Sequence, residues 1–77
     1  IELVYHPGQE FNLVIEGHMM LQIGDKQLFL NEGDSIYFDA NRPHGMKALD
    51  GKRVQFLCGL TPCLGHMRGL AFFQTTE

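Results

Sequence analysis

Turn signals divide this chain into short pieces, and their spacing limits the fold more than any other feature. Pro7-Gly8, Gly24-Asp25 and Asp50-Gly51 are strong turn pairs, and the last is typical of a type I′ hairpin. Between such turns, β-branched, aromatic and other apolar residues alternate with polar ones or cluster. No segment before residue 60 keeps the period of an α-helix. About six or seven short strands therefore predict an all-β sandwich or barrel.

The runs expected to form strands are 1–5, 10–16, 18–23, 26–30, 35–38, 44–49 and 52–60. Gly17 makes the second and third runs a hairpin or a pair joined by a bend. The last stretch has mixed composition, so a final strand over 70–76, a short helix and a tail stay open. We expect one domain, with its core in residues 1–60 and a strand or tail of the same domain in residues 61–77.

Composition narrows the function classes. The chain has 77 residues and a formal net charge of −3, which argues against nucleic-acid binding through phosphate contacts. No apolar run approaches the roughly 20 residues that span a bilayer, and no secretory leader is recognisable. The two cysteines, Cys58 and Cys63, do not form a disulfide framework, so a reduced, cytoplasmic setting is expected.

His6 and Glu10 flank the first turn in the stretch "YHPGQEF" and are candidate ligands of one metal ion. On a strand over 10–16, residues alternate between two faces. One face comprises Glu10, Asn12 and Val14, and the other comprises Phe11, Leu13 and Ile15. The second face is fully apolar and is expected to be covered. A buried carboxylate on the first face needs a partner, because an unpaired buried charge costs several kcal/mol.

His44 is the residue that would complete a site. It heads the expected strand 44–49, and in a small barrel it would point at His6 and Glu10. Two imidazoles and one carboxylate suit divalent iron, manganese, nickel or zinc and leave positions open for water or substrate. Met46 shares the face of His44 and would line a pocket, whereas Asn12 would bind a ligand or satisfy Glu10. The alternative is a hydrogen-bonded His–Glu–His cluster without metal.

Two spaced motifs make residues 6–57 resemble a cupin domain. The first, G-x5-H-x-H-x3,4-E-x6-G, finds its second histidine in His6, its glutamate in Glu10 and its closing glycine in Gly17. The second, G-x5-P-x-G-x2-H-x3-N, opens at Gly33 and has its histidine at His44. Fifteen residues separate the motifs, as in small microbial cupins. The resemblance implies a double-stranded β-helix, or jelly-roll, barrel whose metal ligands are His6, Glu10 and His44.

Departures from the motifs qualify what the resemblance implies. Val4 stands at the position of the first histidine, so three of the four usual ligands remain and metal binding is expected to be weaker or absent. Asp39, Asn41 and Ala48 stand at the proline, glycine and asparagine positions of the second motif. Only residues 1–5 precede the first motif, so the barrel is expected to be incomplete or to be completed by a partner subunit.

The stretch "LNEGDSIYFDANRPHGMKAL" is most similar to the cupin domain at the C-terminus of bacterial transcriptional regulators with an XRE-type helix-turn-helix. In that family the helix-turn-helix binds DNA, and the cupin is thought to sense a small molecule and to help dimerisation. These 77 residues contain no helix-turn-helix. The resemblance implies a homodimeric domain that binds an effector and that contacts neither nucleic acid nor membrane.

Three alternatives stay open beside this sensor. A metal-bound cupin can be an enzyme, such as a dioxygenase, an isomerase or an epimerase, but no additional general acid or base is evident here. A barrel that serves only dimerisation would have bulky side chains in its centre. A zinc site built from Cys58, Cys63 and His66 fits no four-ligand spacing, and buried cysteines acting as small hydrophobic residues are the better interpretation.

Overall fold

Seven β-strands make up the part of the chain that the computed structural model describes, which is residues 1–61 and 70–76. The strands are β1 (Gln9–Glu16), β2 (Met19–Ile23), β3 (Lys26–Leu30), β4 (Ser35–Asp39), β5 (His44–Ala48), β6 (Val54–Thr61) and β7 (Leu70–Thr76). The described residues form no helix, and so none that is long and apolar enough to cross a membrane. The all-β prediction is confirmed.

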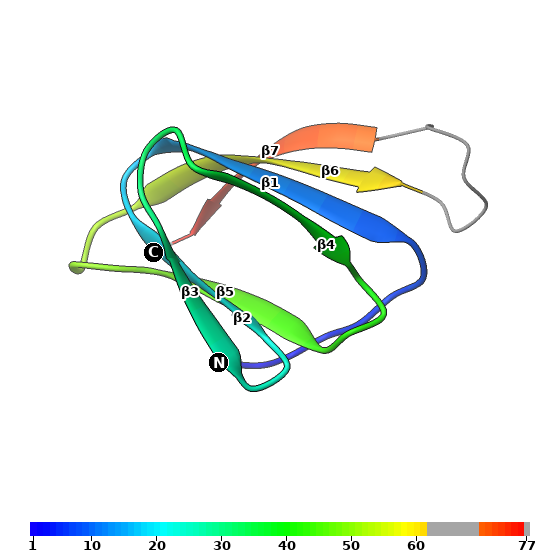
Figure 1. The fold of residues 1–77 in the computed structure, drawn as a ribbon. Helices are drawn as coiled ribbons and strands as arrows, with labels where there is room; N and C mark the ends of the chain where they lie inside the picture. Colours follow the sequence, from blue (N-terminus) through cyan, green and yellow to red (C-terminus); the bar gives the residue numbers. More distant parts are fainter. Residues whose placement is uncertain (62–69, 77) are drawn as a thin grey trace.

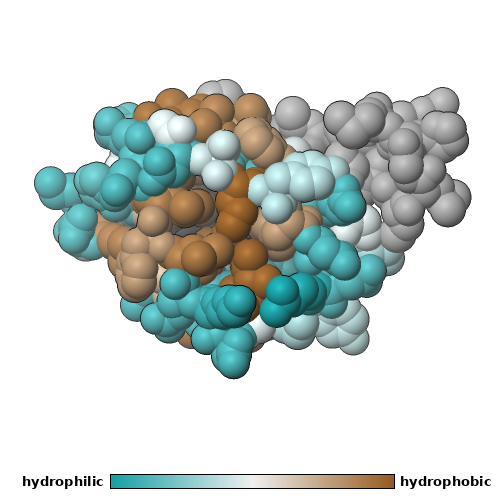
Figure 2. Space-filling view, viewed as in Figure 1, coloured by the Kyte–Doolittle hydropathy of each residue, from teal (hydrophilic) through white to brown (hydrophobic). Residues whose placement is uncertain are grey.

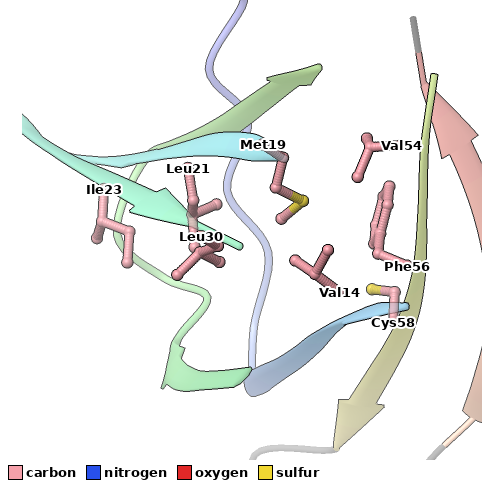
Figure 3. Close-up of a cluster of buried hydrophobic side chains, with 8 residues drawn as sticks. All are labelled: Val14, Met19, Leu21, Ile23, Leu30, Val54, Phe56 and Cys58. Atoms are coloured by element: carbon pink, nitrogen blue, oxygen red, sulfur yellow. The ribbon is translucent and has the colours of Figure 1, made fainter. Parts of the chain in front are cut away.

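The strands form two antiparallel sheets, which lie one above the other in Figure 1. One sheet has the order β4-β1-β6-β7, and the other has the order β3-β2-β5. Side chains from both sheets meet between them, as Figure 3 shows, and form a core of Val14, Met19, Leu21, Ile23, Leu30, Val54, Phe56 and Cys58. This two-sheet packing agrees with the predicted jelly-roll fold.

The space between the sheets is only partly closed. Several apolar side chains that pack against the core are half-buried, namely Leu28, Ile36, Phe38, Met46, Ala48 and Leu60. In the space-filling view of Figure 2, hydrophobic side chains reach the surface in the middle of the face and hydrophilic side chains surround them. The expected incomplete barrel fits this open side.

Two predicted hairpins have different outcomes. Gly24-Asp25 joins β2 to β3, which pair with each other, so that hairpin is confirmed. Asp50 and Gly51 adopt the positive φ angles of 62° and 64° that a type I′ turn requires. The hairpin predicted there is nevertheless wrong, because β5 pairs with β2 and β6 pairs with β1. The turn carries the chain from one sheet to the other, as the bend at Gly17 also does.

Residues 1–6, here called the N-terminal segment, form an isolated bridge instead of the strand expected over 1–5. Val4 and His44 exchange two backbone hydrogen bonds of 2.8 Å. The next donor, His6 N–H, bonds the carbonyl of Ala40 at 2.9 Å, so the segment leaves the β5 ladder. Gly45 permits this close approach, because a Cβ there would lie 2.7 Å from the carbonyl oxygen of Glu2.

The faces of β1 are the reverse of a simple amphipathic strand. Glu10, Asn12 and Val14 are buried between the sheets, with at most 4% of each residue exposed. On the outer face, Phe11 and Leu13 are half-buried and Ile15 is 41% exposed, so this chain does not cover the apolar face as the sequence predicts. Tyr37, which pairs with Phe11, is also on the outside, with 52% exposed.

The C-terminal strand follows β6 in antiparallel register from Leu60↔Leu70 to Val54↔Thr76. This pairing is the strand alternative for residues 70–76. The division into a core of 1–60 and a strand or tail of 61–77 remains a prediction. Cys63 and His66, weighed above as zinc ligands, lie outside the described residues.

Candidate functional site

Three elements bring His6, Glu10 and His44, here called the triad, to one point inside the barrel. His6 ends the N-terminal segment, Glu10 is near the start of β1, and His44 is the first residue of β5. The Nε2 atoms of His6 and His44 lie 3.1 Å and 3.3 Å from Oε1 of Glu10. One ligand atom from each residue lies within 4.8 Å of the other two. The structure therefore juxtaposes the three residues that the motif spacing selected.

The carboxylate of Glu10 is the centre of this arrangement. Its residue is 4% exposed, and its Oε2 accepts a hydrogen bond of 2.8 Å from Nδ2 of Asn12. Because Oε2 is held by Asn12, the other oxygen is left facing the two imidazoles. Asn12 is thus a partner that the sequence required for a buried carboxylate, and the two imidazoles become partners when a proton or a cation lies between them and Oε1.

The other ring nitrogens fix which histidine atoms face Glu10. Nδ1 of His44 lies 2.8 Å from the carbonyl oxygen of Arg42, and Nδ1 of His6 lies 3.2 Å from that of Pro7. A carbonyl oxygen only accepts hydrogen bonds, so each Nδ1 carries the proton. In the neutral imidazole, Nε2 then holds a lone pair directed at Glu10. Such second bonds from the ring to a carbonyl are the usual support of a metal-ligating histidine.

The donor set fits a divalent metal ion. Three lone-pair atoms converge at the distances given above, and such atoms repel unless a proton or a cation lies among them. Ligands about 2.1 Å from one ion are about 3.0 to 3.4 Å apart in octahedral or tetrahedral sites. The separations of 3.1 Å and 3.3 Å lie in this range. Two nitrogens and one oxygen suit iron, manganese, nickel or zinc.

Val4, at the position of the missing fourth ligand, contributes only an apolar side chain. Its backbone holds His44 through the bridge described above, and its side chain lines a cavity of about 370 Å³ in front of the triad. Met46 and Leu60 continue the apolar wall. The cavity therefore has a polar floor and apolar sides, as small-molecule sites commonly do.

Cys58 is a site-lining residue that the sequence interpretation treated only as a small buried hydrophobic residue. It lies on β6 opposite Asn12 and lines the same cavity as the triad. Burial, together with the charge of Glu10 and a hydrogen bond to it, raises the pKa of the Cys58 thiol to about 12. The thiol is thus a neutral donor to Glu10 near pH 7. Alternation along residues 54–60 could have placed it inside, but not beside Glu10.

Four other side chains differ in their position relative to the triad. Met46 lines the cavity, as expected for a pocket residue. Asn12 is fully buried and supports Glu10, the second of its two predicted roles, and its Oδ1 has no hydrogen-bond partner among the described residues. The ring of Phe38 packs edge-on against His44, with centroids 5.0 Å apart. His18 is exposed and bonds Asn31, away from the triad.

Comparison with known proteins gives one match, which covers most of the chain. Residues 1–59 match the cupin domain family. No curated protein and no solved structure matches the sequence. The match spans both motifs and every residue of the triad, and the two-sheet fold agrees with it. The chain belongs to the cupin family.

Proposed function

We propose that this cupin is a ligand-binding domain that holds a divalent metal ion at His6, Glu10 and His44 and binds a small-molecule effector in the cavity beside them. The observation that carries the proposal is the convergence of three lone-pair atoms, namely Nε2 of each histidine and Oε1 of Glu10. The other polar atom of each of these side chains already has a hydrogen-bond partner. Both Nδ1 atoms donate to backbone carbonyls, and Asn12 holds the second oxygen of Glu10. A metal bound there would supply a Lewis-acidic anchor for an oxygen or nitrogen of the effector.

The biological setting follows from the resemblance to XRE-type regulators. In this setting the domain is the sensing and dimerising part of a cytoplasmic bacterial transcriptional regulator, and a separate helix-turn-helix contacts DNA. The similarity of residues 30–49 to that family supports this part of the proposal. A gene that encodes no DNA-binding domain upstream of these residues would contradict it.

The outer face of β1 supports a homodimer. Phe11 and Leu13 are half-buried there, and Ile15 and Tyr37 are 41% and 52% exposed. An apolar sheet face of this kind is stabilised when a second subunit covers it. A chain that sediments as a monomer at tens of micromolar would contradict the dimer.

The alternative is a metal-dependent cupin enzyme, because a three-ligand centre leaves positions open for substrate. Beside the triad, the ionisable side chains among the described lining residues are Glu2 and Cys58. Glu2 is exposed at the cavity mouth, and a thiol with a pKa of about 12 is a poor acid or base near pH 7. These two side chains favour binding over catalysis.

Metal content tests the proposed site. The untagged protein, incubated with iron, manganese, nickel or zinc and then desalted, is analysed by mass spectrometry. We expect about one equivalent of metal in the wild type and in His18→Ala, and a loss in His44→Ala, because His18 is exposed and remote from the triad. A wild type that retains no metal contradicts the metal site and leaves the hydrogen-bonded cluster in its place.

A further inference from the structure

The charges around the cavity limit which ligands it can hold. A divalent ion beside Glu10 leaves one positive charge on the floor, since the histidines are neutral when they bind metal. One anionic group on the ligand neutralises the positive charge at the floor of the cavity, and a second anionic group would need another cation.

The part of the walls formed by described residues offers no such cation. Among the described residues that line the cavity, none is a lysine or an arginine. Val4, Met46 and Leu60 provide apolar contact, and the remaining charged side chain is the carboxylate of Glu2. Glu2 is exposed, whereas the proposed ligands Glu10 and His44 are 4% and 2% exposed, so Glu2 lies nearer the mouth of the cavity than these two ligands do.

The volume bounds the ligand's size. Liquid water occupies about 30 Å³ per molecule, so a cavity of about 370 Å³ accommodates on the order of ten non-hydrogen atoms. We infer that the cavity selects a small monoanionic chelator with an apolar body, and that Glu2 rejects ligands with a second anionic group at their outer end. This inference rests on the proposed metal site and names the chemistry of its effector.

Two acids of equal length test the inference. 2-Oxohexanoate and 2-oxoadipate share a chelating head and a six-carbon chain, but the second ends in a carboxylate instead of a methyl group. Calorimetric titration of the nickel-loaded wild type should show about tenfold tighter binding of 2-oxohexanoate, because the second carboxylate loses hydration against apolar walls and faces Glu2. Pyruvate, which lacks the apolar chain, should bind about tenfold more weakly than 2-oxohexanoate.

Charge variants at Glu2 locate the cause of the preference. Glu2→Gln should reduce the difference in affinity between 2-oxohexanoate and 2-oxoadipate, and Glu2→Lys should reverse the preference. Glu16→Lys is the matched control, because Glu16 is exposed at the far end of β1 and lines a different hollow, and it should leave the ratio unchanged. If Glu2→Lys and Glu16→Lys change the ratio of the two affinities equally, the change is a general effect of net charge, and the role of Glu2 is overturned.

The remaining outcomes separate this inference from the proposed function. Nickel-loaded protein that binds both acids equally, prefers 2-oxoadipate or binds neither overturns the ligand class and leaves the metal site intact. Protein that takes up no nickel, measured in the same samples, contradicts the proposed function and removes the cation that would anchor the anionic ligand.

Discussion

The regions around the two ends of strand β1 contain similar polar side chains, but these side chains interact differently. At the start of the strand, Glu10 and His44 are almost fully buried, and Nε2 of His44 lies 3.3 Å from the carboxylate of Glu10. At its end, His18 bonds Asn31 at 2.9 Å and both residues are exposed. Water competes for the second pair, whereas the first interacts in a medium of low dielectric constant.

This comparison shows that residue type alone does not make a metal-binding site. The far end also has a hollow, of about 480 Å³, lined by residues that include Glu16, His18 and Glu32. Glu32 there accepts a hydrogen bond from the backbone of Gly17 and is exposed. A histidine and three carboxylates, those of Glu16, Glu32 and Asp50, are present, but their ligand atoms are not gathered as those of the triad are. The comparison leads to three further predictions, in order of decreasing effect.

Removing the support of Glu10 should weaken metal binding most. Asn12→Ala is expected to lower metal affinity about 10- to 100-fold, because the amide that holds Oε2 of Glu10 is lost and the carboxylate can turn. Asn31→Ala, which removes the amide partner of His18, is the control and should leave affinity unchanged. Competition with a chromophoric chelator measures both. Equal losses in the two variants would contradict the difference between the ends.

Alanine at two glycines should destabilise the protein for different reasons. Gly45→Ala places a Cβ 2.7 Å from the Glu2 carbonyl, so the N-terminal segment must shift, at a cost of about 1–3 kcal/mol. Gly33 has φ of +84° and open space around it, so Gly33→Ala should cost about 1 kcal/mol through backbone strain alone.

Metal affinity distinguishes the two glycine variants. Gly45→Ala should also weaken metal binding, because the displaced segment carries the Val4 bridge to the His44 backbone and ends at His6. Gly33→Ala should retain wild-type affinity. Urea denaturation gives the stabilities, and the chelator competition gives the affinities. Unchanged metal binding in a destabilised Gly45→Ala variant would show that the segment does not position the triad.

Alkaline pH should destabilise the metal-free protein through Cys58. The thiol has a pKa of about 12 in the folded state against an ordinary value of 9.0, so the folded state holds its proton over a pH range in which the unfolded state has lost it. This contribution is complete below pH 9 and decreases toward pH 12, by about 1 kcal/mol at pH 10. In a Cys63→Ser background, the loss of stability between pH 9 and pH 12 should be smaller in Cys58→Ala. An identical pH dependence in the two proteins would contradict it.

Local chemistry made much of the fold predictable. The turn pairs delimit short strands. The motif spacing selected His6, Glu10 and His44, and their ligand atoms lie within 4.8 Å of one another in the structure. The partner of each strand was not predictable in this way. Asp50-Gly51 adopts the turn that its residues favour, but long-range pairing decides that β5 and β6 lie in different sheets.

The missed site residues have the same cause. Cys58 meets Glu10 only because β6 pairs with β1 in the register that sets Cys58 opposite Asn12. Glu2 reaches the cavity mouth only because Val4 bridges β5 at His44. Neither pairing can be predicted from the spacing of neighbouring residues, because each joins parts of the chain that are far apart in sequence.

The reversed faces of β1 have a consequence for folding. A slip of this strand by one residue against its neighbours would turn Phe11, Leu13 and Ile15 inward and expel Glu10 and Asn12. Hydrophobic burial alone would favour that slipped state, so it competes with the native one as a misfolded trap. The hydrogen bond from Asn12 to Glu10 and the closeness of Glu10 to its two histidines exist only in the native register and oppose the slip. The polar cluster thus helps to determine which fold forms, and an ion bound there would act as a folding template.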